Sequence, residues 1–78
     1  MSYHNLIFSR QLLKKGHALV KRYFPRINVV RDAWTYHSAN TWEFHGPDKF
    51  YWYGDADNAY ECRYKGWMAY LRSKGKIE

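Results

Sequence analysis

The stretch TWEFHGPDKFYWYG, residues 41–54, carries the clearest structural signal in the chain. Residues 41–45 alternate between polar and aromatic side chains, which is the pattern of a strand with one buried face. Residues 46–48, Gly-Pro-Asp, have turn chemistry, and residues 49–53 are dominated by aromatic side chains that favour strands. The stretch therefore predicts an antiparallel hairpin.

The alternation also predicts which hairpin side chains are buried. Trp42 and Phe44 share one face of the first strand because they are two residues apart. Phe50 and Trp52 share one face of the return strand, and cross-strand pairing brings the two sets together over the core. The two tyrosines of the return strand then project from the opposite face.

An amphipathic helix is predicted before the hairpin, over residues 6–24. Apolar side chains recur there at helical spacing, and Pro25 ends the helix because the residue before a proline avoids the helical conformation. Ser2 or Asn5 is the expected N-cap. The predicted apolar stripe consists of Phe8, Leu12, Leu13, Leu19, Val20 and Phe24.

A second helix is predicted after the hairpin, over residues 57–73. Asp57 is favoured over Asp55 as its N-cap, and Gly75 is a possible C-terminal cap followed by a short frayed tail. Gly16 in the first helix indicates close packing. A strip of small side chains along the second helix suits the close approach of a sheet or helix, and it comprises Ala59, Cys62, Gly66 and Ala69.

These elements make one α+β domain over residues 1–78, in which two helices pack on a small antiparallel sheet. Residues 28–37 are extended and form either one strand or an irregular lead-in. So short a chain buries little surface, and the aromatic share of 21% supplies the core with a few large side chains.

Two common stabilising devices of small domains are excluded by the cysteine and histidine pattern. Cys62 is the single cysteine, and no Cys/His set has the spacing of a zinc site. The sequence has no apolar run of signal-peptide or membrane-spanning length. We therefore expect a cytoplasmic protein in a reducing compartment, without a cofactor, a small-molecule substrate or a membrane partner.

Catalytic motifs are missing from the sequence, so we expect no enzymatic activity. Cys62 lies in the small strip of a helix and reads as a buried thiol, and no serine stands in a nucleophile elbow. The four histidines form no helical metal-binding pair. His37 and His45, on either side of the first hairpin strand, could meet on one face of the sheet.

The charge of +6 is unevenly distributed along the chain. Residues 1–31 contain seven lysines and arginines and no acidic residue, whereas residues 43–61 contain five acidic residues and one lysine. A helix face that is only solvated usually mixes the two signs. The acid-free segment therefore favours binding to a polyanion, and both basic ends of the chain are expected to meet on one surface.

Our first hypothesis is a small basic binding module that contacts DNA, RNA or a nucleoprotein complex without strong base-specific readout. The side chains expected to contact phosphates are Lys14, Lys15, Lys21, Arg22, Arg26, Arg63, Arg72 and Lys74.

Residues 42–72 also resemble a family of proteins. The segment WEFHGP, residues 42–47, is followed by FYWYG, residues 50–54, and by a helix with the pattern Ala59-x-x-Cys62-x-x-x-Gly66-Trp67-x-Ala69-x-Leu71. This combination resembles small accessory proteins encoded in tailed-phage genomes. The resemblance implies a compact domain that acts in the host cytoplasm on nucleic-acid or defence machinery, and it carries over no catalytic residue.

The alternative hypothesis is a phage-type inhibitor or modulator that docks on a host protein through the aromatic hairpin and its acidic loop. Exposed tyrosine and tryptophan are the side chains that make interface hot spots. The candidate contact residues are Trp34, Tyr36, Asp48, Tyr51, Tyr53 and Asp55.

Overall fold

The computed structural model describes residues 3–78, with side chains described from residue 6 onward. The elements follow in the order α1 (Tyr3–Tyr23), η1 (Val29–Arg31), β1 (Ala33–Tyr36), β2 (Thr41–His45), η2 (Pro47–Lys49), β3 (Tyr51–Asp55) and α2 (Ala59–Ser73), where η marks a short 3₁₀ helix. The three strands form one antiparallel sheet in the order β1-β2-β3. The predicted α+β class, with helices at both ends of the chain, is confirmed.

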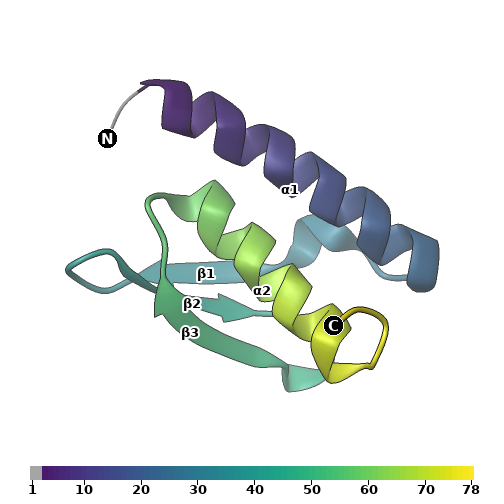
Figure 1. The fold of residues 1–78 in the computed structure, drawn as a ribbon. Helices are drawn as coiled ribbons and strands as arrows, with labels where there is room; N and C mark the ends of the chain where they lie inside the picture. Colours follow the sequence, from purple (N-terminus) through teal and green to yellow (C-terminus); the bar gives the residue numbers. More distant parts are fainter. Residues whose placement is uncertain (1–2) are drawn as a thin grey trace.

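The molecule has three layers (Figure 1). Helix α2 lies against one face of the sheet, and α1 packs mainly against α2. The two helices run in the same direction, because Ser9 near the start of α1 bonds Asn58 at the start of α2, and Phe24 just beyond α1 contacts Tyr70 late in α2. Within residues 3–78, no helix covers the opposite face of the sheet.

The hairpin is confirmed as β2 and β3, paired in the register Trp42↔Gly54 and Phe44↔Trp52. Trp42 and Phe44 are buried, and Trp52 is partly buried against the same core. For residues 28–37 the sequence predicted either one strand or an irregular lead-in. The structure contains both, because the short helix η1 is followed by the regular strand β1.

The apolar stripe predicted for α1 is wrong at Phe8, which is 62% exposed. The buried face instead runs through Ser9, Leu13, Gly16 and Val20. Small side chains face α2 because the helices approach closely there, and a Cβ on Gly16 would lie 3.1 Å from Cδ1 of Tyr64. The close packing expected at Gly16 is confirmed.

The start of α1 also differs from the expectation. Asn5 lies inside the helix and is therefore not its N-cap, and Ser2 lies outside the described residues. The helix ends at Tyr23, one residue earlier than predicted.

The N-cap of α2 is Asn58, not Asp57. The Asn58 side chain accepts a 2.9 Å hydrogen bond from the backbone N–H of Glu61 and donates a 3.1 Å bond to Oγ of Ser9. Asp57 takes part through its backbone, whose N–H donates to Oε1 of Glu61 at 2.8 Å. Asn58 is the cap because its side-chain amide can do two things at once: its oxygen accepts from the helix N-terminus, and its nitrogen donates to the neighbouring helix α1.

The C-terminal cap of α2 is confirmed at Gly75, which adopts a φ of +71°. The N–H groups of Gly75 and Lys76 donate to the carbonyls of Arg72 and Leu71, which completes a Schellman motif. The tail is not frayed, because Ile77 packs against the core.

The small strip of α2 seats the helix on the sheet, as predicted. A Cβ on Gly66 would lie 2.1 Å from Cγ of Phe44, so only glycine permits this approach. Next to Phe44 in β2, the carbonyl of Glu43 contacts the helix through a 3.4 Å bond from Sγ of Cys62. The largest fully buried side chains are Trp67, Phe44, Leu71, Val20 and Cys62.

Candidate functional site

The cations of α1 are exposed and divide into two rows along the helix. Lys14 and Lys21 are seven residues apart and share one side, whereas Lys15 and Arg22 share another. Arg26 follows just beyond the helix and is also exposed. Among the described side chains, none of these five cations forms an ion pair.

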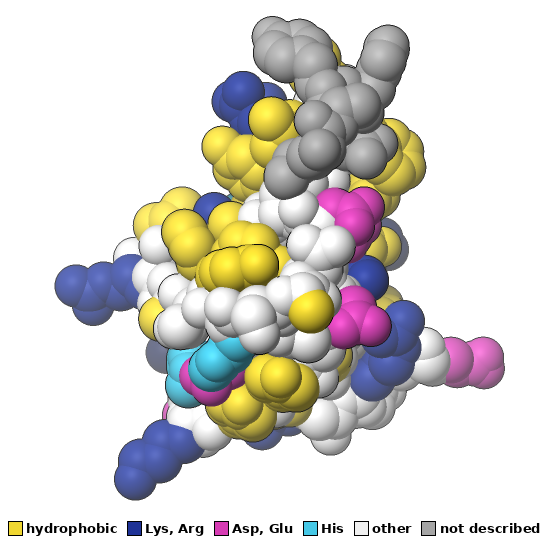
Figure 2. Space-filling model, turned by 90° about the vertical axis from the view of Figure 1, so that its left-hand side faces the viewer, with side chains coloured by type: hydrophobic (Ala, Val, Ile, Leu, Met, Phe, Trp, Pro, Cys, Tyr) yellow, Lys and Arg dark blue, Asp and Glu magenta, His cyan; other side chains and the backbone are white. Residues whose placement is uncertain are grey.

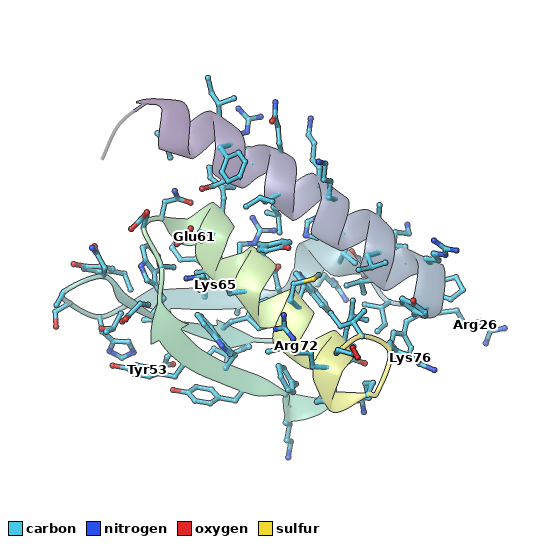
Figure 3. All side chains as sticks on the ribbon, viewed as in Figure 1. Arg26, Tyr53, Glu61, Lys65, Arg72 and Lys76 are labelled. Carbon is cyan, nitrogen blue, oxygen red and sulfur yellow. The ribbon has the colours of Figure 1, made fainter. Side chains whose placement is uncertain are left out.

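The acidic side chains lie on other elements. Glu43 and Asp55 belong to the sheet, and Asp48 to the turn between β2 and β3. Nζ of Lys65, on α2, lies 3.6 Å from Oε1 of Glu61, one turn earlier in the helix (Figure 3). The same ammonium group donates to the carbonyl of Asp55 at 2.7 Å. The exposed surface of α1 is therefore cationic, while the sheet and the start of α2 carry the acids.

A pocket of about 140 Å³ lies between the two helices. Its lining includes Arg10, Lys14, His17, Tyr60 and Arg63. The Arg10 guanidinium lies 5.8 Å from the centre of the Tyr60 ring, in cation–π geometry. Nε2 of His17 is buried and has no hydrogen-bond partner among the described atoms, and burial, followed by the charge of Arg63, lowers the pKa of this histidine.

Arg63 is not the free phosphate ligand that the sequence suggested. Its Nε lies 2.9 Å from Oδ1 and 3.0 Å from Oδ2 of Asp32, and Trp67 Nε1 donates to the same carboxylate at 2.8 Å. The Asp32 side chain is 2% exposed and that of Arg63 is 17% exposed. Asp32, the first acidic residue after the basic segment, was not predicted from the sequence as a partner for Arg63.

Cations from both ends of the chain meet where the two helices end. Nζ of Lys76 lies 5.7 Å from the ring centre of Phe24, and Nζ of Lys74 lies 5.6 Å from that of Tyr70. Figure 3 shows Arg26 and Lys76 projecting from this same end of the molecule. The expected convergence holds for these residues, because the helices run in parallel.

Arg72 is exposed, and its Nε donates to the backbone oxygen of Glu78 at 2.8 Å. Its guanidinium is thus tied to the chain end, which reduces its freedom to contact a ligand.

The aromatic residues proposed for docking divide between the two faces of the sheet. Trp34 pairs with Phe44, and Tyr36 pairs with Trp42, so both belong to the face that carries α2. Tyr53 pairs with Glu43 on the opposite face, which we call the outer face. The four aromatic candidates therefore cannot form one contiguous patch.

Trp34 and Tyr36 are 46% and 52% exposed although they share a face with the core. Helix α2 lies mainly over β2 and β3 and leaves part of the edge strand β1 uncovered. Both rings pack against Trp42, with ring centres 5.8 Å and 5.0 Å from it. Trp42 is fixed in turn by a 2.9 Å bond from Nε1 to the carbonyl of Ala56.

Figure 2 views the end of the molecule where the β1–β2 turn lies. Hydrophobic side chains occupy the middle of this view, and histidine side chains lie below them next to an acidic group. Most of the other acidic side chains visible there lie to the right, toward the β3 side.

The predicted meeting of His37 and His45 on one sheet face is confirmed, with Glu43 between them. His37 Nε2 lies 2.6 Å from Oε2 and His45 Nε2 lies 2.9 Å from Oε1 of the carboxylate. These bonds, with that of His45 the larger influence, lower the pKa of Glu43. Partial burial, followed by the charge of Glu43, raises the pKa of Tyr51. Glu43 is the group that sequence reasoning missed, although it stands two residues before His45 and therefore on the same strand face.

No cluster of three or more histidine, cysteine or acidic side chains in the described part of the chain is arranged to hold a metal ion. Burial, as the largest influence, raises the pKa of Cys62 to about 12, so the thiolate that a nucleophile requires does not form near neutral pH.

Comparison with protein-family models, with curated proteins and with solved structures finds no match to this chain. Within residues 3–78, neither helix is both long and apolar enough to cross a bilayer. The fold and its exposed cations define a small basic α+β domain.

Proposed function

We propose that this chain binds nucleic acid through the cationic surface of α1. The observation that carries the proposal is the exposure of Lys14, Lys21 and their neighbours without ion pairs, on a helix that contains no described acid. Cations held on a rigid element can contact several phosphates and release condensed counterions.

The phosphate contacts assigned by this proposal are fewer than the sequence suggested. Arg63 is excluded because Asp32 neutralises its charge. Arg72 is secondary because it is tied to the chain end. The remaining side chains are Lys14, Lys15, Lys21, Arg22, Arg26 and Lys74, and they suit backbone contact without base-specific readout.

The test is binding to a fluorescently labelled duplex and to a single strand across a range of salt concentrations. Affinity should fall steeply with salt, and Lys14→Gln/Lys21→Gln should weaken binding and reduce the salt slope, by roughly 0.7 to 0.9 for each phosphate that is no longer neutralised. Lys49→Gln, which removes one exposed cation from η2, is the control for lost surface charge and should bind as the wild type does. Absence of binding to either nucleic acid at about 50 mM salt would contradict the proposal.

A second candidate function, docking of a phage-encoded modulator on a host protein, is favoured by the outer face. Tyr51 and Tyr53 are both about half exposed there, beside Glu43. A partner captured from nuclease-treated bacterial lysate and no longer captured by Tyr51→Ala/Tyr53→Ala would support this function. Capture that depends on nucleic acid would count against it.

A further inference from the structure

We infer that the exposed rings of Trp34 and Tyr36 bind unpaired bases of a single-stranded nucleic acid, whose backbone is held by the basic pocket between α1 and α2. This inference rests on the proposed function and names the form of nucleic acid and a site for it.

The rings form a supported stacking surface. Trp34 and Tyr36 are about half exposed and both pack against the Trp42 ring, with ring centres 5.8 and 5.0 Å away. Trp42 is 9% exposed and hydrogen-bonded through its indole nitrogen, so its ring is held in place when a base stacks on Trp34 or Tyr36. Aromatic side chains held in this way stack on bases of any sequence, with a contribution of about 1–3 kcal/mol for each base.

The pocket between the helices has the chemistry of a phosphate site. Arg10 and Lys14 line it, and neither forms an ion pair with any described carboxylate. His17 also lines the pocket, although its Nε2 is buried. The charged groups that a phosphate in the pocket would meet are therefore those of Arg10 and Lys14.

A chain of contacts connects the pocket with the stacking surface. Arg63 lines the pocket and is paired with Asp32, which is two residues before Trp34 in the chain. Two residues of extended backbone span roughly 7 Å. One nucleic-acid strand can therefore reach from the pocket to the rings, and the carboxylate of Asp32 is buried and paired with Arg63.

An unpaired strand fits this arrangement better than a duplex. In a duplex the faces of the bases are stacked against one another, so side chains meet only base edges and backbone. The flat faces of Trp34 and Tyr36 then have nothing to stack on. A strand with free bases offers a π-face for each ring.

The experiment compares binding of labelled single strands, about 12 nucleotides long, with the duplex of the same sequence. Trp34→Ala/Tyr36→Ala should weaken single-strand binding at least about tenfold, because stacking contributes about 1–3 kcal/mol for each base. The salt dependence of single-strand binding by this variant should equal that of the wild type, since the phosphate contacts remain. The single strand should also quench the tryptophan fluorescence of the wild-type protein, because Trp34 is exposed, whereas Trp42 and Trp67 are buried and Trp52 is partly buried.

Two further variants separate stacking from folding. Trp34→Leu/Tyr36→Leu keeps apolar packing on Trp42 but removes the flat rings, and it should lose affinity as the alanine variant does. Tyr51→Ala/Tyr53→Ala removes an equally exposed pair from the outer face and should bind single strands as the wild type does. Circular dichroism verifies the fold of each variant.

Wild-type affinity in the leucine variant, or tighter binding to the duplex than to the single strand, would overturn the inference while nucleic-acid binding through α1 stands. Failure of the wild-type protein to bind either nucleic acid would remove the proposed function itself, and the inference with it.

Discussion

Gly66 shows how a single hydrogen atom in place of a side chain sets the distance between α2 and the sheet. The Phe44 ring fills the place where a Cβ would be, and both residues are buried. The helical pattern of residues 57–73 indicated that small side chains would allow a close approach, but it could not name the residue that would sit against them.

We expect Gly66→Ala to lower the free energy of unfolding by about 1–3 kcal/mol, because the new methyl group overlaps a ring that has no room to move. The overlap outweighs the gain of about 1 kcal/mol in helix propensity. Urea denaturation measures the change. Gly16→Ala is the matched control, since its methyl group lies no closer than 3.1 Å to Tyr64 and 3.4 Å to the end of the Met68 side chain, and it should change stability by less than about 1 kcal/mol. Equal losses in both variants would contradict this explanation.

Glu43 is expected to make stability depend on pH. Its pKa in the folded protein lies below the ordinary value of 4.5 because His45 and His37 hydrogen-bond the charged carboxylate. As the pH falls, the unfolded chain therefore takes up the proton first. The stabilisation is present above pH 4.5 and is lost as the pH falls through the lowered pKa of the folded state.

Urea midpoints at about pH 6 and about pH 3, on either side of the ordinary carboxyl pKa, test this dependence. The wild-type protein should lose more stability over this interval than Glu43→Gln. Glu78→Gln, which removes a carboxylate from the exposed C-terminus, controls for the change in net charge and should behave as the wild type does. Parallel pH profiles for wild type and Glu43→Gln would show that the histidine bonds do not contribute.

At the scale of elements, the start of α2 depends on a contact that crosses between helices. Asn58 is 4% exposed and bonds both the Glu61 backbone and the Ser9 hydroxyl. Sequence rules correctly placed an N-cap within one residue, but they favoured Asp57 because they see only the local chain. The choice between neighbouring cap residues was made by α1, which is 49 residues away along the chain at Ser9.

We expect Asn58→Ala to destabilise the protein by about 1–3 kcal/mol, because it removes the cap and leaves the buried Ser9 hydroxyl without this donor. Asp57→Ala should change stability by about 0.5 kcal/mol or less, since Asp57 contributes its backbone N–H. Thermal unfolding of both variants measures the difference. A larger loss in Asp57→Ala would restore Asp57 as the cap.

At the scale of the whole molecule, Asp32 joins the segment before β1 to α2. Its buried carboxylate accepts bonds from Arg63 and from the indole nitrogen of Trp67. The residues are 31 and 35 positions apart in sequence, so no local pattern indicated the contact. The same contact takes Arg63 out of the set of free cations.

Asp32→Asn should lower the free energy of unfolding by about 3–5 kcal/mol, because it leaves the Arg63 charge largely buried without its counter-charge. The amide oxygen can still accept a bond from Trp67, so the loss reports on the ion pair. Asp32→Asn/Arg63→Met, which removes both charges, should recover much of the stability in urea denaturation. A double variant as unstable as the single one would show that the ion pair is not the cause.

The sequence by itself determined the hairpin, the two helices and the acid-free basic segment, because each depends on side-chain periodicity, turn chemistry or charge within a short stretch of chain. Only the tertiary structure decided which cations remain free, which aromatic rings share a face, and which residue caps α2. Arg63, Trp34 and Asn58 each acquire their role from a contact with another segment of the chain: Asp32, Trp42 and Ser9, respectively. Packing between such elements selects one neighbour from many that the local pattern would allow.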